Sequence, residues 1–354
     1  MGEEMGPGPP SIAGPRQIVL GLVFVLVLAV GIGVLIAKTA GFQEVLDDLG
    51  NAKAAWLPVC LLLEVVSYGG YVVTLRAVAS IDSGPTIRAW PATRLVMASL
   101  GATRIVSPAG AGGLALTYWA LKRTGLRTRD AAARVVGLNI LIFGIFGAWA
   151  TIAAIILLVG FGDSAPLGMT LPWIIMVPAC MMAAAWVSAP ARGERLAVPP
   201  AHGWPRRALA AAVSGLLVVR HIVLQPRAHG NALMGAIIYW VGDVLCLWAA
   251  LQAVGANVPI HGVALAYATA YIAMLVPLPT GGFGALDAAA TFTLTLLDIP
   301  LASAFSGVVV WRAFNFWLPT VPALIELVRV RDLGRLLARG DEAQATMDPG
   351  GSPH

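Results

Sequence analysis

Long runs of apolar residues, separated by short polar connectors, dominate the sequence. A helix needs about 20 consecutive apolar residues to cross the hydrocarbon core of a bilayer. Six runs approach or exceed that length: residues 17–37, 56–78, 130–159, 171–189, 231–254 and 301–328. The pattern therefore predicts an all-α polytopic membrane protein with six full spans.

Two further apolar segments are interrupted by proline and glycine. One contains SPAGAGGLAL from Ser107, and the other contains PLPTGGFGALD at residues 277–287. Superposed without a gap, they align prolines and glycines at equal spacing: Pro108 with Pro279, Gly110 with Gly281, and Gly113 with Gly284. Both residue types interrupt helical hydrogen bonding and leave backbone N–H and C=O groups unpaired. Within a membrane such groups need partners inside the protein or in a water-filled cavity. Paired broken segments in the two halves of a chain indicate a transporter-type site.

The distribution of lysine and arginine predicts the orientation of the segments, because basic residues gather in cytoplasmic loops. Basic connectors flank the first broken segment, residues 91–121, whereas connectors 255–261 and 298–300 around the second contain neither Lys nor Arg. Each broken segment is therefore predicted to enter and leave the membrane on one side as a re-entrant hairpin, the two from opposite sides. Eight full spans is the alternative, because tilted hairpin legs are nearly long enough to cross.

This arrangement is an inverted repeat with both termini in the cytoplasm, and a bacterial-type cytoplasmic membrane is the expected location. The arginine-rich segment 190–230 is interpreted as an amphipathic helix lying at the cytoplasmic interface. The predicted divisions of the chain are a disordered tail at 1–16, one transmembrane domain at 17–333 with repeat cores near 91–159 and 261–328, and a polar tail at 334–354.

Composition excludes a soluble globular protein, since 58% of the residues are hydrophobic and only 12% are charged, against about a quarter in soluble domains. The net charge of +5 belongs to basic connectors, which membrane orientation and anionic lipid explain without nucleic acid. Cys60, Cys180 and Cys246 all lie in apolar runs and are interpreted as small core-filling residues. Their spacing does not suggest a metal site, and we expect no cofactor.

Charged residues inside apolar segments are costly and indicate functional sites by default. There are six: Glu64, Arg104, Arg134, Asp243, Asp287 and Arg312. In one interpretation, half-helix N-termini at the breaks and the arginines bind an anionic headgroup. In the other, the charges form internal pairs, Asp287 with Arg312 and Glu64 with Arg104. Arg134 is expected to extend to the interface.

The candidate lipid-binding residues therefore come from both breaks and the charges beside them. They are Arg104, Ser107, Pro108, Gly110, Gly112, Gly113, Pro277, Pro279, Gly281, Gly282, Gly284, Asp287 and Arg312, with Glu64 and Asp243 as buried charge partners. We assign no catalytic residue, because the histidines are scattered in connectors and none pairs with a serine or cysteine.

PLPTGGFGALD, followed by VVVWRAFNFWLP around Arg312, resembles the membrane domain of the lysylphosphatidylglycerol synthases, a flippase-like family. The resemblance covers about residues 17–333. It implies movement of aminoacylated phosphatidylglycerol between leaflets, a separate soluble domain being the part that makes that lipid in two-domain relatives. Because the sequence after Arg339 does not contain such a domain, we expect a stand-alone flippase-like protein rather than an aminoacyl transferase.

Two positions depart from the family pattern. After the paired glycines of the first motif, relatives continue into a glutamate and an arginine, whereas Leu114 and Thr117 stand here. The acidic residue of the second motif is present, shortened to Asp287. If the missing pair binds headgroup in relatives, the ligand here differs, and an isoprenoid-linked or other polar lipid becomes a candidate.

We therefore expect a translocator for a polar or anionic lipid, without ATP hydrolysis of its own and with membrane lipids as its partners. One alternative is a membrane enzyme that transfers a group to or from a lipid carrier, with Asp287 or Glu64 as general base. Another is an accessory subunit that binds a lipid- or glycan-synthesising enzyme through segment 190–230.

Overall fold

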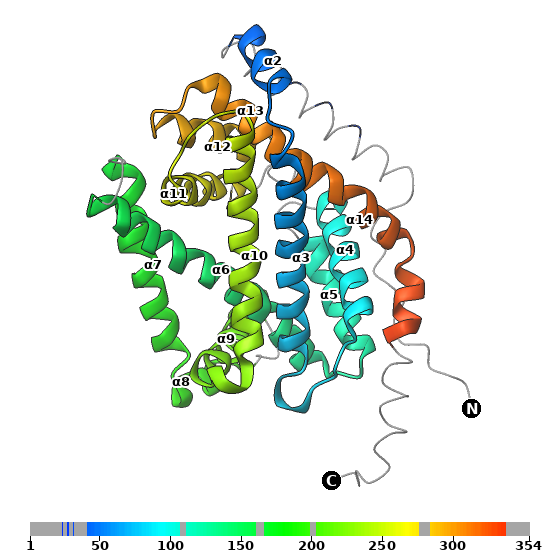
Figure 1. Ribbon diagram of the computed structural model, residues 1–354. Helices are drawn as coiled ribbons and strands as arrows, with labels where there is room; N and C mark the ends of the chain where they lie inside the picture. Colours follow the sequence, from blue (N-terminus) through cyan, green and yellow to red (C-terminus); the bar gives the residue numbers. More distant parts are fainter. Residues whose placement is uncertain are drawn as a thin grey trace.

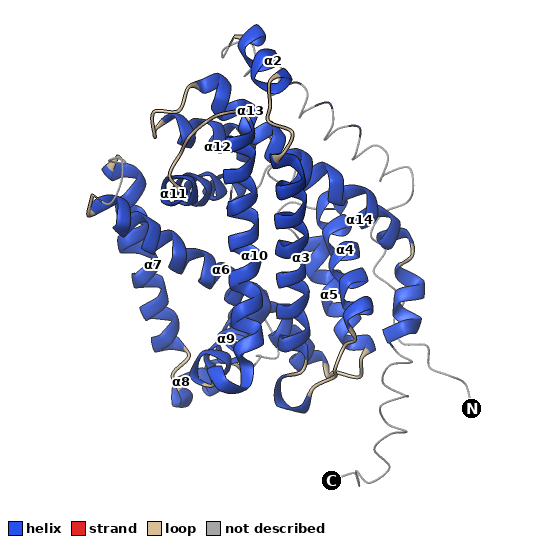
Figure 2. Cartoon of the chain, in the orientation of Figure 1, coloured by secondary structure: helices blue, strands red, loops and turns tan. Residues whose placement is uncertain are grey.

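The computed structural model describes residues 41–106, 111–160, 166–198, 203–275 and 284–337, together with positions 23, 27 and 31. Every regular element in these ranges is a helix (Figure 2), which confirms the predicted all-α class. In chain order the elements are α2 (Phe42–Gly50), α3 (Trp56–Ala79), η1 (Ile81–Ser83), α4 (Ala89–Val106), α5 (Ala111–Arg123), α6 (Thr128–Leu158), α7 (Leu167–Val187), α8 (Pro190–Leu196), α9 (Trp204–Leu224), α10 (Pro226–Ala253), α11 (Ile260–Tyr271), η3 (Ile272–Leu275), α12 (Ala285–Thr295), α13 (Leu301–Arg312), η4 (Ala313–Trp317) and α14 (Leu318–Val328).

Six of the described helical stretches are long and apolar enough to cross a membrane, and the protein is a multi-pass membrane protein. They are Trp56–Ala79, Thr128–Leu158, Leu167–Val187, Pro205–Leu224, Pro226–Ala253 and Leu301–Val328. Five match predicted spans, whereas the predicted first span lies almost wholly outside the described residues.

The sixth stretch belongs to α9, which the sequence predicted to lie along the interface. Its length and apolar composition also suit a span. In Figure 1, α9 is foreshortened at the lower end of α10, whereas α3 and α10 are seen along their length. Its position relative to the bilayer stays a prediction.

Helices α3 and α10 form the centre of the fold and run antiparallel beside each other (Figure 1). Small residues allow this close approach. A Cβ atom added at Gly70 would lie 2.6 Å from the carbonyl oxygen of Gly235, and one at Gly242 would lie 2.8 Å from that of Leu63. Ser67 also donates a hydrogen bond across the contact to the carbonyl oxygen of Tyr239 at 2.7 Å. This glycine-lined contact, which we call the α3–α10 seam, resembles the small-residue packing typical of membrane helices.

Each broken segment folds back on itself. Helix α4 packs against α5, and α11 packs against α12. Figure 1 shows α4 and α5 connected to their neighbours at the lower end of the molecule, and α11 and α12 connected at the upper end. The two helix pairs thus enter from opposite ends, as the distribution of basic residues predicted. The turns themselves, at 107–110 and 276–283, lie outside the described residues.

The long helix of each half covers the hairpin of the other half. Helix α14 packs against α4, and α6 packs against α11. Arg94 of α4 and Glu326 of α14 reinforce the first contact with an ion pair of 2.6 Å. At Gly101, an added Cβ would lie 2.6 Å from the carbonyl oxygen of Ala323, so α4 and α14 also approach closely. These exchanged contacts join the two halves of the inverted repeat into one body.

One side-chain prediction was wrong, and one stays a prediction. Arg134 is buried in the protein and donates hydrogen bonds to the carbonyl oxygens of Ala79, at the end of α3, at 2.6 Å and of Ile81, in η1, at 2.7 Å. Its position relative to the membrane interface stays a prediction. Cys180 does not fill the core, since its side chain lies on an exposed face of α7, whereas Cys60 and Cys246 are buried as predicted.

Candidate functional site

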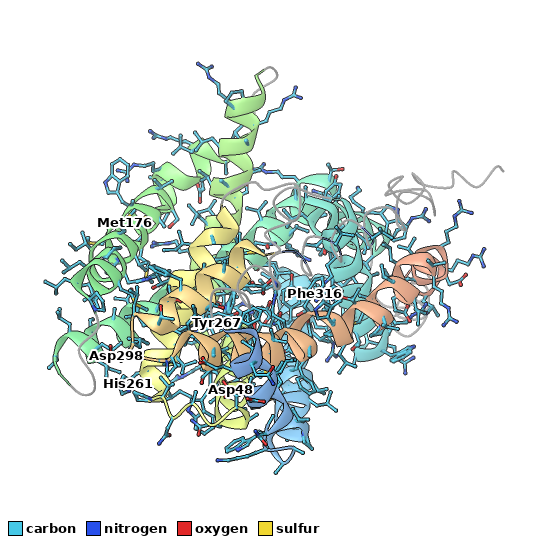
Figure 3. The ribbon with its side chains drawn as sticks, turned by 90° about the horizontal axis from the view of Figure 1, so that it is seen from above. Asp48, Met176, His261, Tyr267, Asp298 and Phe316 are labelled. Carbon is cyan, nitrogen blue, oxygen red and sulfur yellow. The ribbon has the colours of Figure 1, made fainter. Side chains whose placement is uncertain are left out.

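Five of the six intramembrane charges converge where the two hairpins approach the α3–α10 seam. They are Glu64 on α3, Arg104 on α4, Asp243 on α10, Asp287 on α12 and Arg312 on α13. In the view from above, Tyr267 and Phe316, which neighbour these charges, lie near the middle of the molecule, while Met176, His261 and Asp298 lie toward one side (Figure 3). We call the connected set the central polar network: Glu64, Tyr68, Arg104, Asp243, Tyr267, Asp287, Trp311, Arg312, Asn315 and Thr320.

Asp243 is the most completely bonded acid of the network. It is 2% exposed, and its carboxylate accepts hydrogen bonds from Tyr267 Oη at 2.6 Å, Trp311 Nε1 at 2.7 Å and Asn315 Nδ2 at 2.9 Å. Three donors compensate the loss of hydration that a buried carboxylate otherwise suffers. Asn315 Nδ2 also lies 3.4 Å from Glu64 Oε1, so one amide group connects the two acids.

Arg104 connects the first hairpin to an irregular turn in the other half. Residues 313–317 form one π-helical turn, η4, which precedes Pro319. Proline has no N–H, so the carbonyl oxygen of Asn315, four residues earlier, loses its α-helical donor. That oxygen instead accepts hydrogen bonds from Arg104 Nη2 and Tyr68 Oη, both at 3.1 Å. Irregular helical turns of this kind are frequent at functional sites.

Other groups of the same turn complete the surroundings of Arg104. Nη1 donates to the carbonyl oxygen of Phe316 at 2.6 Å and to the hydroxyl group of Thr320. The guanidinium carbon also lies 4.0 Å from the centre of the Phe316 ring. Both terminal nitrogens of Arg104 therefore donate to neutral acceptors, and the guanidinium also lies over an aromatic ring.

Asp287 performs two tasks at the start of α12, directly after the second break. Its Oδ2 accepts a hydrogen bond from the backbone N–H of Gly284 at 3.1 Å, which caps the helix. Its Oδ1 forms an ion pair with Nε of Arg312, and both side chains are at least four-fifths buried. Gly284 adopts a positive φ of 74°, which favours glycine at this position.

The internal-pair interpretation is thus correct for Asp287 with Arg312 and wrong for Glu64 with Arg104. Arg104 bonds to backbone oxygens and hydroxyl groups instead of to that carboxylate. The N–H of Gly284, one candidate for holding an anion, already bonds to Asp287. A ligand that uses this helix end must therefore displace a carboxylate.

Gly113 of the first break has a packing role. A Cβ added there would collide with Thr103 Oγ1 and lie 2.8 Å from the carbonyl oxygen of Ser99, so the glycine allows α5 to approach α4. Gly112 is also buried. The remaining candidates lie outside the described residues, and their assignment stays a prediction: Ser107, Pro108, Gly110, Pro277, Pro279, Gly281 and Gly282.

Sequence reasoning missed the uncharged members of the network, including Tyr68, Tyr267, Trp311, Asn315 and Thr320. Pro319 was the signal for one of them, because a proline within a hydrophobic helix leaves the carbonyl four residues earlier without its donor. The aromatic members gave no comparable signal. Tyr267 and Trp311 belong to a ring cluster with Phe146, Trp240 and Tyr271, and most of its contacts are ordinary edge-to-face packing.

Comparison with known proteins agrees with this architecture. No curated protein matched the sequence. The family model described as the lysylphosphatidylglycerol synthase TM region matches residues 18–323, which include both hairpins and every member of the central polar network. That match spans most of the chain and links it to lipid modification or translocation. The chain belongs to the lysylphosphatidylglycerol synthase transmembrane family.

Proposed function

We propose that this protein moves a polar or anionic lipid between the leaflets of a bacterial-type cytoplasmic membrane. One observation carries the proposal: charges beside both broken segments, which enter from opposite ends of the fold, meet in a single buried network. A lipid headgroup that crosses the bilayer needs polar partners at its middle depth, and opposed broken segments provide such sites in transporters.

In this proposal, Arg312 recognises the lipid headgroup by exchanging its partner Asp287 for the headgroup. At rest, its guanidinium pairs with Asp287. A phosphodiester headgroup offers the same kind of anionic oxygens, and a guanidinium binds them in a bidentate manner. Binding of the headgroup to Arg312 then frees Asp287 and loosens the start of α12. Because α12 belongs to the second hairpin, the exchange connects headgroup binding to movement of the second half against the first.

The direct test is a leaflet-resolved assay in proteoliposomes with a panel of labelled lipids. The panel should contain phosphatidylglycerol, an aminoacylated phosphatidylglycerol, phosphatidylethanolamine and a polyprenyl phosphate. We expect the protein to accelerate transfer of at least one lipid, and Arg312→Ala and Asp287→Ala each to abolish that acceleration. Unchanged transfer by both variants would remove these residues from the site.

Arg335→Ala is the matched control, because Arg335 pairs with Asp332 in an exposed helical turn. It should transfer lipid at the wild-type rate. Mass spectrometry of the recovered lipids separates the enzyme alternative, which predicts a chemically changed product. A translocator returns the same lipid in the other leaflet.

The orientation of the two breaks is tested by labelling single cysteines at Ala109 and Thr280, in a variant that lacks the three native cysteines. We expect reagents confined to opposite sides of the membrane to reach the two positions. Labelling of both from one side contradicts the inverted arrangement and, with it, the proposed path.

A further inference from the structure

The charges of the central polar network do not balance. It contains three carboxyl groups, on Glu64, Asp243 and Asp287, and two guanidinium groups, on Arg104 and Arg312. With every group ionised, the network has a formal charge of −1. The neighbouring turns at 107–110 and 276–283 contain no charged residue that would correct this charge. A single proton on one carboxyl group makes the network neutral.

Geometry identifies Glu64 as the acid that holds this proton. Asp243 accepts three short hydrogen bonds, and Asp287 accepts from a backbone N–H and pairs with Arg312. Glu64 is 4% exposed, and its Oε1 has only the long contact of 3.4 Å to Asn315. Its Oε2 is buried and has no hydrogen-bond partner among the described residues. An ionised carboxylate in that position is strongly disfavoured.

The groups that face Glu64 do not provide a countercharge in direct contact. From α10 come Asp243, a like charge, and the thiol of Cys246. That thiol donates to the carbonyl oxygen of Cys60 at 3.5 Å. From α4 comes Arg104, whose donors already serve the η4 turn. On α3 itself, Cys60 and Tyr68 are the nearest titratable neighbours, and the hydroxyl of Tyr68 donates to the carbonyl oxygen of Asn315.

We infer that Glu64 is a proton-binding site and that the proton carried there is the ion that couples lipid movement to the transmembrane pH gradient. The inference rests on the proposed translocation. In the closed arrangement of the structure, Glu64 is a neutral acid and the network is balanced. When the network opens to water on one side, the proton leaves the Glu64 carboxyl group for that side, and the carboxylate takes up a proton when it opens to the other.

Asn315 connects the proton to the lipid site. Its amide nitrogen contacts both Glu64 and Asp243, and its Oδ1 lies 3.5 Å from Nη1 of Arg312. Loss of the proton leaves two carboxylates on either side of one amide, which favours a repositioned side chain or a nearby cation. Arg312, which contacts the amide oxygen of Asn315, is the cation that exchanges its partner in the proposed lipid cycle. Proton release and release of Arg312 from Asp287 are therefore linked through one side chain.

A metal cation at Glu64 is a poorer match than a proton. Hard cations need several oxygen ligands at close range. The described residues contain no cluster of three or more His, Cys, Asp or Glu side chains arranged to hold one. Because a sodium gradient would produce similar coupling, it forms a separate arm of the transport test.

The first test does not depend on transport. Infrared spectra of the purified protein at neutral pH, in a detergent without ester or carboxyl groups, should show the carbonyl stretching band of a protonated carboxyl group. Glu64→Gln should remove that band, and Glu194→Gln, at an exposed position of α8, should retain it. If Glu64→Gln does not fold, Glu64→Asp should shift the band. A missing band in the wild-type protein, or a band that Glu64→Gln leaves intact, overturns the assignment.

The second test measures transport under an imposed pH gradient in proteoliposomes that accelerate lipid transfer. We expect the direction of the gradient to change the net transfer by the wild-type protein and by Glu194→Gln. Glu64→Gln should lose its response to the gradient. A response to sodium alone, or equal responses by both variants, overturns proton coupling. Failure of the wild-type protein to move any lipid contradicts the proposed function, while the infrared result still decides the proton site.

Discussion

The two hairpins occupy equivalent places in the inverted repeat, yet their charges have opposite signs and lie on different legs, Arg104 before the first break and Asp287 after the second. Beside the first break, the cation Arg104 is held by neutral oxygens of the η4 turn. Beside the second, the anion Asp287 is held by a cation, Arg312. Both interactions end on one continuous stretch, α13–η4–α14. The comparison teaches that repetition of the backbone arrangement does not require repetition of its chemistry, and that one helix connects both hairpins.

The Asp287–Arg312 ion pair at the second hairpin should contribute more to the free energy of unfolding than the Arg104 hydrogen bonds at the first. Replacing Arg312 with Met should destabilise the protein by about 3–5 kcal/mol, because it leaves the Asp287 carboxylate buried and unpaired. Chemical unfolding in detergent measures the change. Asp287→Asn in the same background should recover part of the loss, and a purely additive double variant would show that the pair does not act as a unit.

Arg335→Met is the control for that measurement. Arg335 and Asp332 form an ion pair of 3.5 Å with side chains 76% and 60% exposed. Exposed pairs of this kind contribute about 0–1 kcal/mol. A comparable loss of stability in Arg312→Met and Arg335→Met would contradict the view that burial makes the Asp287–Arg312 pair important for stability.

The stability of the first hairpin should depend on the shape of the Arg104 side chain as well as on its positive charge. Arg104→Lys keeps the charge but cannot serve the carbonyl oxygens of Asn315 and Phe316 together, so we expect a loss of about 1.5–3 kcal/mol. The same unfolding assay measures it. Arg88→Lys, in the connector before α4, offers a control with little expected effect. Full stability of Arg104→Lys would mean that charge alone holds the first hairpin.

The α3–α10 seam tests whether the two halves depend on contact as much as on charge. Gly70→Ala should cost about 1–3 kcal/mol, since the added Cβ would lie 2.6 Å from backbone atoms of Gly235 and Tyr239. Gly69→Ala, at the adjacent position, meets no atom within 4 Å and should be neutral or slightly stabilising. Equal effects would show that the seam tolerates wider spacing than its geometry indicates.

The smallest expected effect concerns the hydroxyl group of Tyr68 at the first hairpin, which also accepts a long contact of 3.5 Å from Arg104 Nη2. Tyr68→Phe removes one of the two donors to the carbonyl oxygen of Asn315, while Arg104 remains. We expect a loss of about 0.5–1.5 kcal/mol. Tyr71→Phe on the same helix is the control, and a larger loss there would point to packing rather than to the hydrogen bond.

Much of this fold follows from the sequence, because long apolar segments and the positions of basic residues are one-dimensional signals. The hairpins at Pro108 and Pro279 were predicted from those signals alone, and so were Glu64, Asp243 and Arg312 as buried charges. Which groups these buried charges would bind was harder to predict. Glu64 and Arg104 have opposite charges, but the carbonyls released near Pro319 lie closer to Arg104 and give it better partners.

Arg134 shows a second limit of sequence reasoning. Its place near the start of a span gave no indication of its partners, which are the carbonyl oxygens of Ala79 and Ile81, more than fifty residues earlier in the chain. Which helix ends meet is decided by the three-dimensional arrangement. Asn315 and Tyr267 were missed for a similar reason, since an amide or a phenol within an apolar segment carries little signal until its neighbours are known.

Pro319 has one more consequence, for the mechanics of the stretch that connects both hairpins. A regular helix resists bending because every turn is tied to the next by its own N–H groups. At Pro319 that internal tie is missing, and the bond to Arg104 replaces it from outside. The hydroxyl group of Tyr68 donates to the same oxygen. Stiffness at this point is therefore supplied by the opposite half of the protein, and the helix would bend more easily without these two bonds.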